Sequence, residues 1–263
     1  MLPAMLDTLS PHLPRLALVT GAGRRIGRAI ALDLAQAGFD IAIHCSGSVS
    51  DAQSAAEEVR ALGRRAAVLT ADLSCEAETE PLVQRAEEAL GQPVGVLVNN
   101  ASTFERDEAL SATRAGWDFH MEVNLRAPFV LIQQMARRLP AGAEGVVVNL
   151  LDQRVWNLTP HFTTYTLSKA GLWTLTQTLA LALAPRIRVV GVGPGPALPS
   201  VRQTAEQFAA QCEGTPLRRG TDPAEICRAV RFALGARSFT GQMIALDGGQ
   251  HLQWAPGSLP PEE

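Results

Sequence analysis

Short apolar runs recur along this chain and alternate with longer amphipathic stretches. Each run is continuously apolar, which is typical of strands covered by helices on both faces. Strands that alternate with helices at this spacing predict an α/β fold built on one doubly wound parallel sheet. The seven candidate strands are residues 16–20, 41–44, 66–70, 94–99, 145–150, 187–192 and 243–246.

The length of the chain fits a single domain. Its 263 residues are enough to bury one large α/β core, and no repeat or linker interrupts the pattern. We expect an irregular, proline-containing leader at residues 1–14, one domain at 15–254, and a flexible tail at 255–263.

Composition excludes several classes of partner. A net charge of −3 without a Lys/Arg-rich run gives no footprint for nucleic acid. The longest apolar stretch, residues 172–184, is too short to span a membrane. The four cysteines form no C-x-x-C pair and no signal peptide is visible, so we expect a reduced, cytoplasmic protein. The scattered histidines show no metal-ligand spacing, and we expect no metal.

A glycine-rich turn follows the first predicted strand and precedes a predicted helix. Its glycines let the backbone approach a pyrophosphate, whose charge suits the amides at a helix N-terminus. A glycine-rich turn alone is also compatible with a purely structural role, but this position favours a dinucleotide site in a Rossmann-type fold. We expect cofactor contacts from Gly21, Arg24, Arg25, Ile26 and Gly27.

The end of the second predicted strand bears on cofactor choice. NAD-selective sites usually carry an acid there, whereas residues 44–48 contain none and Asp40 lies at the other end of the strand. Arg24 and the hydroxyls of Ser46 and Ser48 can receive a 2′-phosphate. The sequence therefore favours NADPH over NADH.

Two further strand ends carry polar residues. Asp72 and Leu73 follow the third strand, where a side chain can contact adenine, and Asn100 and Ala101 follow the fourth. Each alone is equally compatible with an Asx turn or a helix cap. Together, at successive strand ends, they favour one bound dinucleotide.

Tyr165 and Lys169 are four residues apart and share one face of a predicted helix. A free phenol titrates at about 10, and a neighbouring ammonium stabilises the phenolate, which brings it within reach of acid–base chemistry near neutrality. Asp152 lies thirteen residues before the tyrosine. Lys169 can also reach the ribose hydroxyls, so the pair is predicted to serve both chemistry and cofactor binding.

These motifs together resemble the short-chain dehydrogenase/reductase family from about Arg15 to Gly249. The resemblance implies that Asn124 is a catalytic helix-bulge residue holding a water that links Lys169 to solvent. It also implies that Pro194 and Gly195 lie beside the nicotinamide, and that the protein is a homo-oligomer, a dimer or tetramer. The matching motifs are Thr20 to Gly27, Asp72, Asn99 to Ala101, Asn124, Tyr165, Lys169 and Pro194-Gly195.

Three departures from the family pattern are informative. Asp152 stands where the family usually has serine, Arg25 replaces the middle glycine of the turn, and Phe104 follows Asn-Asn-Ala-Ser-Thr. All three resemble the pteridine reductase and dihydromonapterin reductase branch. This branch implies an NADPH-dependent reductase that transfers hydride to a pterin or dihydrofolate-like substrate.

A planar pterin can stack between the nicotinamide and Phe104. Arg25 can donate to its oxygen or ring nitrogen. Asp152 can accept from its 2-amino group or help Tyr165 pass a proton. We expect catalysis from Asn124, Asp152, Tyr165 and Lys169, and substrate contacts from Arg25, Ser102, Phe104, Asp152 and Tyr165.

Alternatives remain open at this stage. A ketone or 3-oxoacyl reductase requires a protonated Asp152, because an ionised one would repel the developing oxyanion. A non-catalytic NADPH-binding sensor is a second alternative. Trp156, His161 and Phe162 either line the pocket or pack the loop that carries them, and residues 198–212 are expected to cover the substrate.

Overall fold

The fold is a seven-stranded, fully parallel sheet in the order β3-β2-β1-β4-β5-β6-β7. The structure is a computed structural model, and it describes residues 9–200 and 202–253. The parallel strand order confirms the predicted doubly wound fold. The strands are β1 (Leu16–Val19), β2 (Asp40–Cys45), β3 (Ala66–Thr70), β4 (Val94–Asn99), β5 (Gly145–Leu150), β6 (Ile187–Pro194) and β7 (Met243–Leu246).

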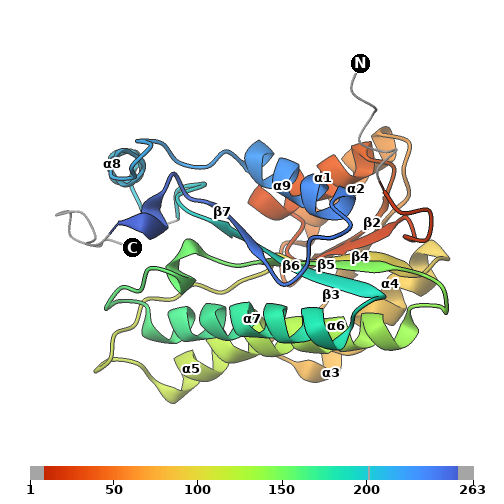
Figure 1. The fold of residues 1–263 in the computed structure, drawn as a ribbon, viewed down its shortest axis with the longest axis horizontal. Helices are drawn as coiled ribbons and strands as arrows, with labels where there is room; N and C mark the ends of the chain where they lie inside the picture. The colour runs from red at the N-terminus through yellow and green to blue at the C-terminus, as the bar shows by residue number, and fades with distance from the viewer. Residues whose placement is uncertain (1–8, 201, 254–263) are drawn as a thin grey trace.

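Helices cover both faces of the sheet (Figure 1). On one face lie α1 (Arg25–Gln36), α2 (Val49–Ala61) and α9 (Pro223–Gly235). On the other lie α3 (Glu76–Thr79), α4 (Leu82–Leu90), α5 (Arg114–Met121), α6 (Ala127–Arg138) and α7 (Thr163–Ala182). Helix α8 (Ala205–Glu213) stands apart from both layers, and the short elements are η2 (Glu122–Arg126), η3 (Gln153–Val155) and η4 (Gln250–Leu252).

Strand β1 shows how the sheet builds two cores. Ala17 and Val19 point into the cluster formed with α1, α2 and α9. Leu16 and Leu18 point into the opposite cluster, formed with α4 and α6. All four are fully buried, because side chains of a strand alternate between faces and both faces are covered.

The strand order reverses between β1 and β4. From β1 the chain proceeds outward through β2 to β3, then returns to pair β4 with the other side of β1. The connections that leave β1 and β4 therefore diverge, and ligands of such sheets bind at the carboxyl ends of the strands beside this switch point.

The ends of the chain are only partly described. The predicted leader is described from Leu9 onward, where Ser10 and Leu13 are buried against the domain. The predicted tail lies outside the described residues. Among the helices that are described, none combines the length and apolar character needed to cross a membrane.

Candidate active site

The glycine-rich turn connects β1 to α1. Gly21 has φ +63°, a conformation that favours glycine. A Cβ on Gly27 would lie 2.3 Å from the carbonyl oxygen of Gly21, so this position accepts no side chain. The Asn100 side chain donates to the carbonyl oxygen of Thr20 at 2.8 Å. The predicted cofactor residue Asn100 thus holds the turn from beneath.

A buried imidazole also fixes this turn. His44 Nδ1 accepts from the Gly21 amide at 3.2 Å, and Nε2 lies 3.0 Å from the carbonyl oxygen of Ala71. Since that carbonyl only accepts, the proton is on Nε2 and the ring is neutral. Burial lowers the pKa of His44 and favours this neutral form. Sequence reasoning missed this residue.

Thr20 ties the turn to the neighbouring strand end. Its Oγ1 accepts from the amides of Asn100 and Ala101, each at 3.0 Å. Ala101 therefore lies directly against the turn.

The predicted 2′-phosphate residues come from two segments: Arg24 immediately precedes α1, and Ser46 and Ser48 lie between β2 and α2. Arg24 and Ser46 are exposed, and the hydroxyl of Ser48, the N-cap of α2, makes no capping bond. Arg24 Nε lies 3.6 Å from a carboxylate oxygen of Asp51 in the first turn of α2. Arg24 and Ser46 therefore face solvent, where a ligand can reach them.

Asp72 forms an Asx turn, which was the alternative to a contact with adenine. Its Oδ1 accepts from both the amide and the hydroxyl of Ser74, at 2.9 and 2.8 Å. This holds the pKa of the Asp72 carboxyl below its ordinary value. Leu73 is buried in the core.

Arg25 begins α1 with φ +53°, the left-handed conformation, where the family usually has glycine. Its guanidinium donates to the carbonyl oxygens of Pro199 and Leu198, at 2.9 and 3.2 Å. Arg25 therefore connects the glycine-rich turn with the segment after β6. Gly195 begins that segment, and a Cβ there would lie 2.7 Å from Asp247 Cα.

The reacting centre is built on α7, which places Tyr165 and Lys169 one turn apart, both buried. The Tyr165 hydroxyl donates to Asp152 Oδ2 at 3.0 Å. Lys169 Nζ donates to the carbonyl oxygen of Leu150 at 2.9 Å and lies 5.8 Å from the centroid of the Tyr165 ring. The fold thus brings together three of the four residues predicted to be catalytic.

Lys169 is fully buried, and its burial lowers the pKa of the ammonium from 10.5 to about 8, although the charge of Asp152 opposes the change. The ammonium therefore remains mostly protonated at neutral pH. A proton on Lys169 is held more weakly than on an exposed lysine, which suits a group that exchanges protons with its surroundings.

Asn124 lies in η2, a π-helical segment that joins α5 to α6. Its amide nitrogen donates to the carbonyl oxygen of Thr103 and to Ser168 Oγ, both at 3.0 Å. Its amide oxygen accepts from the Thr103 amide at 2.9 Å and the Ser102 hydroxyl at 3.1 Å. The side chain thereby fastens the loop after β4 to α7.

An aromatic wall stands beside Tyr165. Phe104 stacks on Phe162 with ring centroids 4.4 Å apart and planes at 10°, and it meets Tyr165 edge-on at 4.6 Å. Phe162 is buried and has φ +59°. The Phe162 ring thus covers one face of the Phe104 ring and fixes the orientation of Phe104.

These residues surround a cavity of about 230 Å³. The predicted residues that line it are Arg25, Ile26, Phe104, Asp152, Tyr165, Pro194 and Gly195. Residues that were not predicted individually as site residues also line it: Leu151, Gln153, Arg154, Pro196, Ala197, Leu198, Ser200, Phe208, Gln211 and Gln250. Four of these fall within residues 198–212, the predicted cover.

Ser102, Trp156, His161 and Phe162 are not among the described residues that line this cavity. Trp156 instead packs edge-on against Trp173 and His251. His161 Nδ1 lies 3.0 Å from Glu108 Oε1. The Ser102 hydroxyl donates to Asn124. In this structure these side chains pack the surrounding loops.

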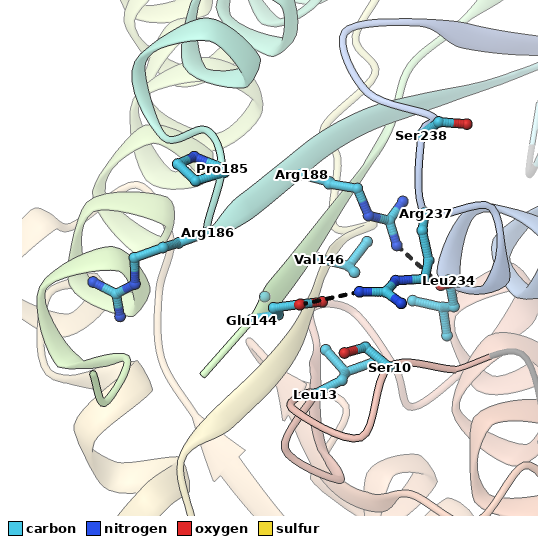
Figure 2. Close-up of a pocket in the computed structure, with 11 residues that line it drawn as sticks. Ser10, Leu13, Glu144, Val146, Pro185, Arg186, Arg188, Leu234, Arg237 and Ser238 are labelled. Atoms are coloured by element: carbon cyan, nitrogen blue, oxygen red, sulfur yellow. Dashed lines mark hydrogen bonds and ion pairs between the residues drawn. The ribbon is translucent and has the colours of Figure 1, made fainter. Parts of the chain in front are cut away.

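A larger cleft, of about 400 Å³, lies at the opposite, amino-terminal edge of the sheet (Figure 2). Its arginines serve the framework. Arg188 donates to carbonyl oxygens at the end of α9, and Arg186 donates to those of Leu139 and Pro140 after α6. Arg237 points towards Glu144 at 3.4 Å. The chemistry-bearing residues therefore lie in the smaller cavity.

Comparison with known proteins identifies the class. A family model described as short chain dehydrogenase matches residues 15–209. The chain belongs to the short-chain dehydrogenase family and is an oxidoreductase of that family, which confirms the resemblance drawn from its motifs.

Two kinds of relative bear on the substrate. A 3-oxoacyl-[acyl-carrier-protein] reductase FabG from Aggregatibacter actinomycetemcomitans is 36% identical over 241 residues, covering 88% of this chain and 97% of the relative. The FolM alternative dihydrofolate reductase 1 of Brucella canis, a structure complexed with NADP, is 45% identical with a TM-score of 0.90, covering 95% and 100% of the two chains. The Brucella suis FolM structure with NADP is 48% identical with a TM-score of 0.88, covering 93% and 98%.

Proposed function

We propose that the protein is an NADPH-dependent reductase of a pterin or dihydrofolate-like substrate. The observation that carries this proposal is the contact between the Tyr165 hydroxyl and Asp152 Oδ2 at 3.0 Å. An acid at this position gives Tyr165 a partner that exchanges protons, whereas the usual serine only supplies a neutral hydroxyl. The identity of 45–48% to the two FolM structures supports the same branch.

The residues around the glycine-rich turn fit a dinucleotide phosphate. Helix α1 has no acidic residue in its first turn and no side-chain capping bond, so its amino-terminal amides are open to an anion. Arg24, Ser46 and Ser48 would hold the 2′-phosphate, and Asn100 and Ala101 would support the turn. NADPH, when bound, supplies the hydride. Both FolM structures are complexes with NADP, which supports this choice of cofactor.

The side chains of the chain itself would handle the proton. Tyr165 donates its hydroxyl proton to a substrate nitrogen, and Asp152, hydrogen-bonded to the same hydroxyl, assists the transfer. The buried ammonium of Lys169 stabilises negative charge that develops on the Tyr165 oxygen. Asn124 would keep the loop after β4 and helix α7 in register around this group.

A flat heterocycle suits the walls of the cavity. The exposed surface of Phe104, braced by Phe162, offers a stacking partner on one side. Asp152 presents carboxylate oxygens that can accept from ring N–H and amino groups, and Arg25 lines the same cavity as a donor. This pairing of an acceptor and a donor around a ring platform supports a pterin.

Reduction of a 3-oxoacyl substrate or another ketone is the second candidate. The 36% identity to FabG supports it. It requires Asp152 to be protonated, because a carboxylate beside the Tyr165 hydroxyl would repel the oxyanion that forms on a carbonyl oxygen.

The test is NADPH oxidation by the purified protein, followed near 340 nm with correction for pterin absorbance. Dihydrobiopterin, dihydromonapterin and dihydrofolate are compared with a panel of 3-oxoacyl and ketone substrates. Turnover of the pterins that disappears in Asp152→Ala supports the proposal. Turnover of the carbonyl panel alone selects the second candidate. NADPH binding without any turnover would favour a sensor and refute both.

Association with further copies is also part of the proposal. Leu181 of α7 is 83% exposed, and Trp117 and Phe119 of α5 are each more than two-fifths exposed. Helices α5 and α7, which carry these apolar side chains, pack against each other. Burial of these side chains against further copies would form a dimer or tetramer, which light scattering on the purified protein would measure.

A further inference from the structure

Arg154 stands directly beside the proposed reacting group. It belongs to η3, the single turn that follows β5, and Asp152 caps this turn. Asp152 Oδ1 accepts from the Arg154 amide at 2.8 Å, while Oδ2 accepts from the Tyr165 hydroxyl. The side chain of Arg154 lines the same cavity as Asp152 and Tyr165.

The guanidinium of Arg154 is held by aromatic rings. Its central carbon lies 5.0 Å from the ring centroid of Phe162 and 5.9 Å from those of Phe104 and Tyr165. Its hydrogen bonds are long: Nη1 reaches Thr159 Oγ1 at 3.3 Å and the carbonyl oxygen of His161 at 3.5 Å. The rings orient the cation without neutralising its charge.

Part of this guanidinium has no partner within the described residues. Arg154 Nε is buried and makes no hydrogen bond there, and none of the described carboxylates lies within 4.0 Å of the group. The neighbouring Gln153 also lines the cavity, and its buried Oε1 has no partner among the same residues. Buried polar atoms are almost always paired, so unpaired ones on a cavity wall point to a ligand.

Arg188 provides the contrast within the same chain. It is half-buried like Arg154, but Nη1 and Nη2 donate to the carbonyl oxygens of Ala233, Leu234, Ala236 and Phe239 around the end of α9. A half-buried arginine with a structural role is therefore well satisfied in this fold. Arg154 is not.

The charges around the cavity leave Arg154 uncompensated. Asp152 acts on the buried ammonium of Lys169. Arg25 lies at the start of α1, where the proposed pyrophosphate would balance it. Among the described residues that line the cavity, Asp152 is the only Asp or Glu, so no other acid of this lining is left to pair with Arg154. A guanidinium in such a setting favours a carboxylate, which it can bind through two parallel hydrogen bonds.

We propose that Arg154 binds a carboxylate of the substrate, so that the site selects a reduced pterin with an acidic tail, as in dihydrofolate, over an uncharged one. This inference rests on the proposed function and narrows its substrate class. Arg154 is then a specificity residue, and its loss should raise KM for the acidic substrate more than it lowers kcat.

The experiment compares dihydrofolate with its dimethyl ester, which keeps the ring and tail but lacks both carboxylate charges. We expect the wild-type protein to favour the free acid by about 10- to 100-fold in kcat/KM, the range of a hydrogen bond to a charged group. Arg154→Gln should abolish this preference, and Arg154→Lys should retain part of it. Arg237→Gln, which removes one positive charge in the distant cleft, is the matched control and should leave the preference unchanged.

NADPH binding and thermal melting establish that each variant is folded. Equal kcat/KM for acid and ester in the wild-type protein would overturn the inference even if Arg154→Gln did not fold. A preference that survives in a folded Arg154→Gln would overturn it as well. If neither substrate is turned over, the proposed function fails together with this inference. If both are turned over equally, only this inference fails.

Discussion

The buried ammonium of Lys169 should make the stability of the protein depend on pH in a way that one substitution removes. Burial lowers the pKa of this group to about 8, whereas an unfolded chain holds the proton until about pH 10.4. Between these values the unfolded state binds more protons than the folded state. The free energy of unfolding therefore rises with pH over this window, and the cost of burying the charge is fully present below pH 8.

The size of the effect follows from the two pKa values. Their separation corresponds to about 3 kcal/mol of unfolding free energy, of which about 2 kcal/mol should be recovered between pH 7.5 and pH 10. Lys169→Met removes the titrating group and keeps an unbranched side chain of similar length. The difference in unfolding free energy between wild type and variant should therefore change by about 2 kcal/mol across this range.

Urea unfolding of the ligand-free protein, at one fixed protein concentration and at half-unit steps of pH, measures this difference. Fixed concentration matters because association of copies stabilises the folded state. Arg237→Met, at an exposed position in the distant cleft, is the control and should follow the wild-type curve. Wild-type and Lys169→Met curves that run parallel from pH 7.5 to 10 would show that the ammonium is not buried as described.

Three further substitutions test the site. Tyr165→Phe should lower turnover by about 100- to 10,000-fold while NADPH binding, measured by fluorescence, stays within about twofold; retained turnover would remove Tyr165 from the chemistry. Asp152→Ser restores the residue usual in the family and should lose dihydropterin turnover while gaining 3-oxoacyl turnover, and a variant that keeps its pterin activity would contradict the role of the acid. Gly27→Ala should weaken NADPH binding and destabilise the protein by about 1–3 kcal/mol, because the added Cβ would meet Gly21 at 2.3 Å. Gly116→Ala, on α5, where the added Cβ would lie 3.4 Å from Thr113 Oγ1, should be harmless in the same assays.

The strands were the most predictable part of the fold. Residues 66–70, 94–99, 145–150 and 243–246 form strands with the predicted bounds, because parallel strands buried on both faces leave unbroken apolar runs in the sequence. Strand β6 runs two residues further than predicted, to Pro194. Its final residues pair with β7, and Gly193 and Pro194 carry no apolar pattern that would indicate this.

The site was predictable where a motif fixes geometry. The spacing of Tyr165 and Lys169 places both on one helix face, and the structure brings Asp152 to the same hydroxyl. That Arg154 lies near the site could have been predicted, since it comes two residues after Asp152 in a turn that Asp152 caps. That no described acid lies near its guanidinium could not be predicted, because this depends on how the loop at residues 156–162 packs around the side chain.

His44 and Phe162 show the limits more sharply. A histidine at a strand end carries no signal that it will accept from Gly21, 23 residues earlier in the chain. Phe162 adopts φ +59°, which few non-glycine residues do, and its stacking on Phe104 joins segments 58 residues apart. Such contacts are set by tertiary packing and leave no local pattern.

Arg25 connects the proposed cofactor site with the substrate cavity. The same side chain begins the helix at the glycine-rich turn and is bonded to the backbone of Leu198 and Pro199 over the cavity. A ligand at the turn that displaces this guanidinium breaks its bonds to Leu198 and Pro199. The free energy that holds the segment after β6 in its present position then changes. Thermodynamic reciprocity then requires a ligand in the cavity to alter affinity at the turn by the same factor. Nucleotide and substrate affinities in this protein are therefore expected to be linked quantities, not independent ones.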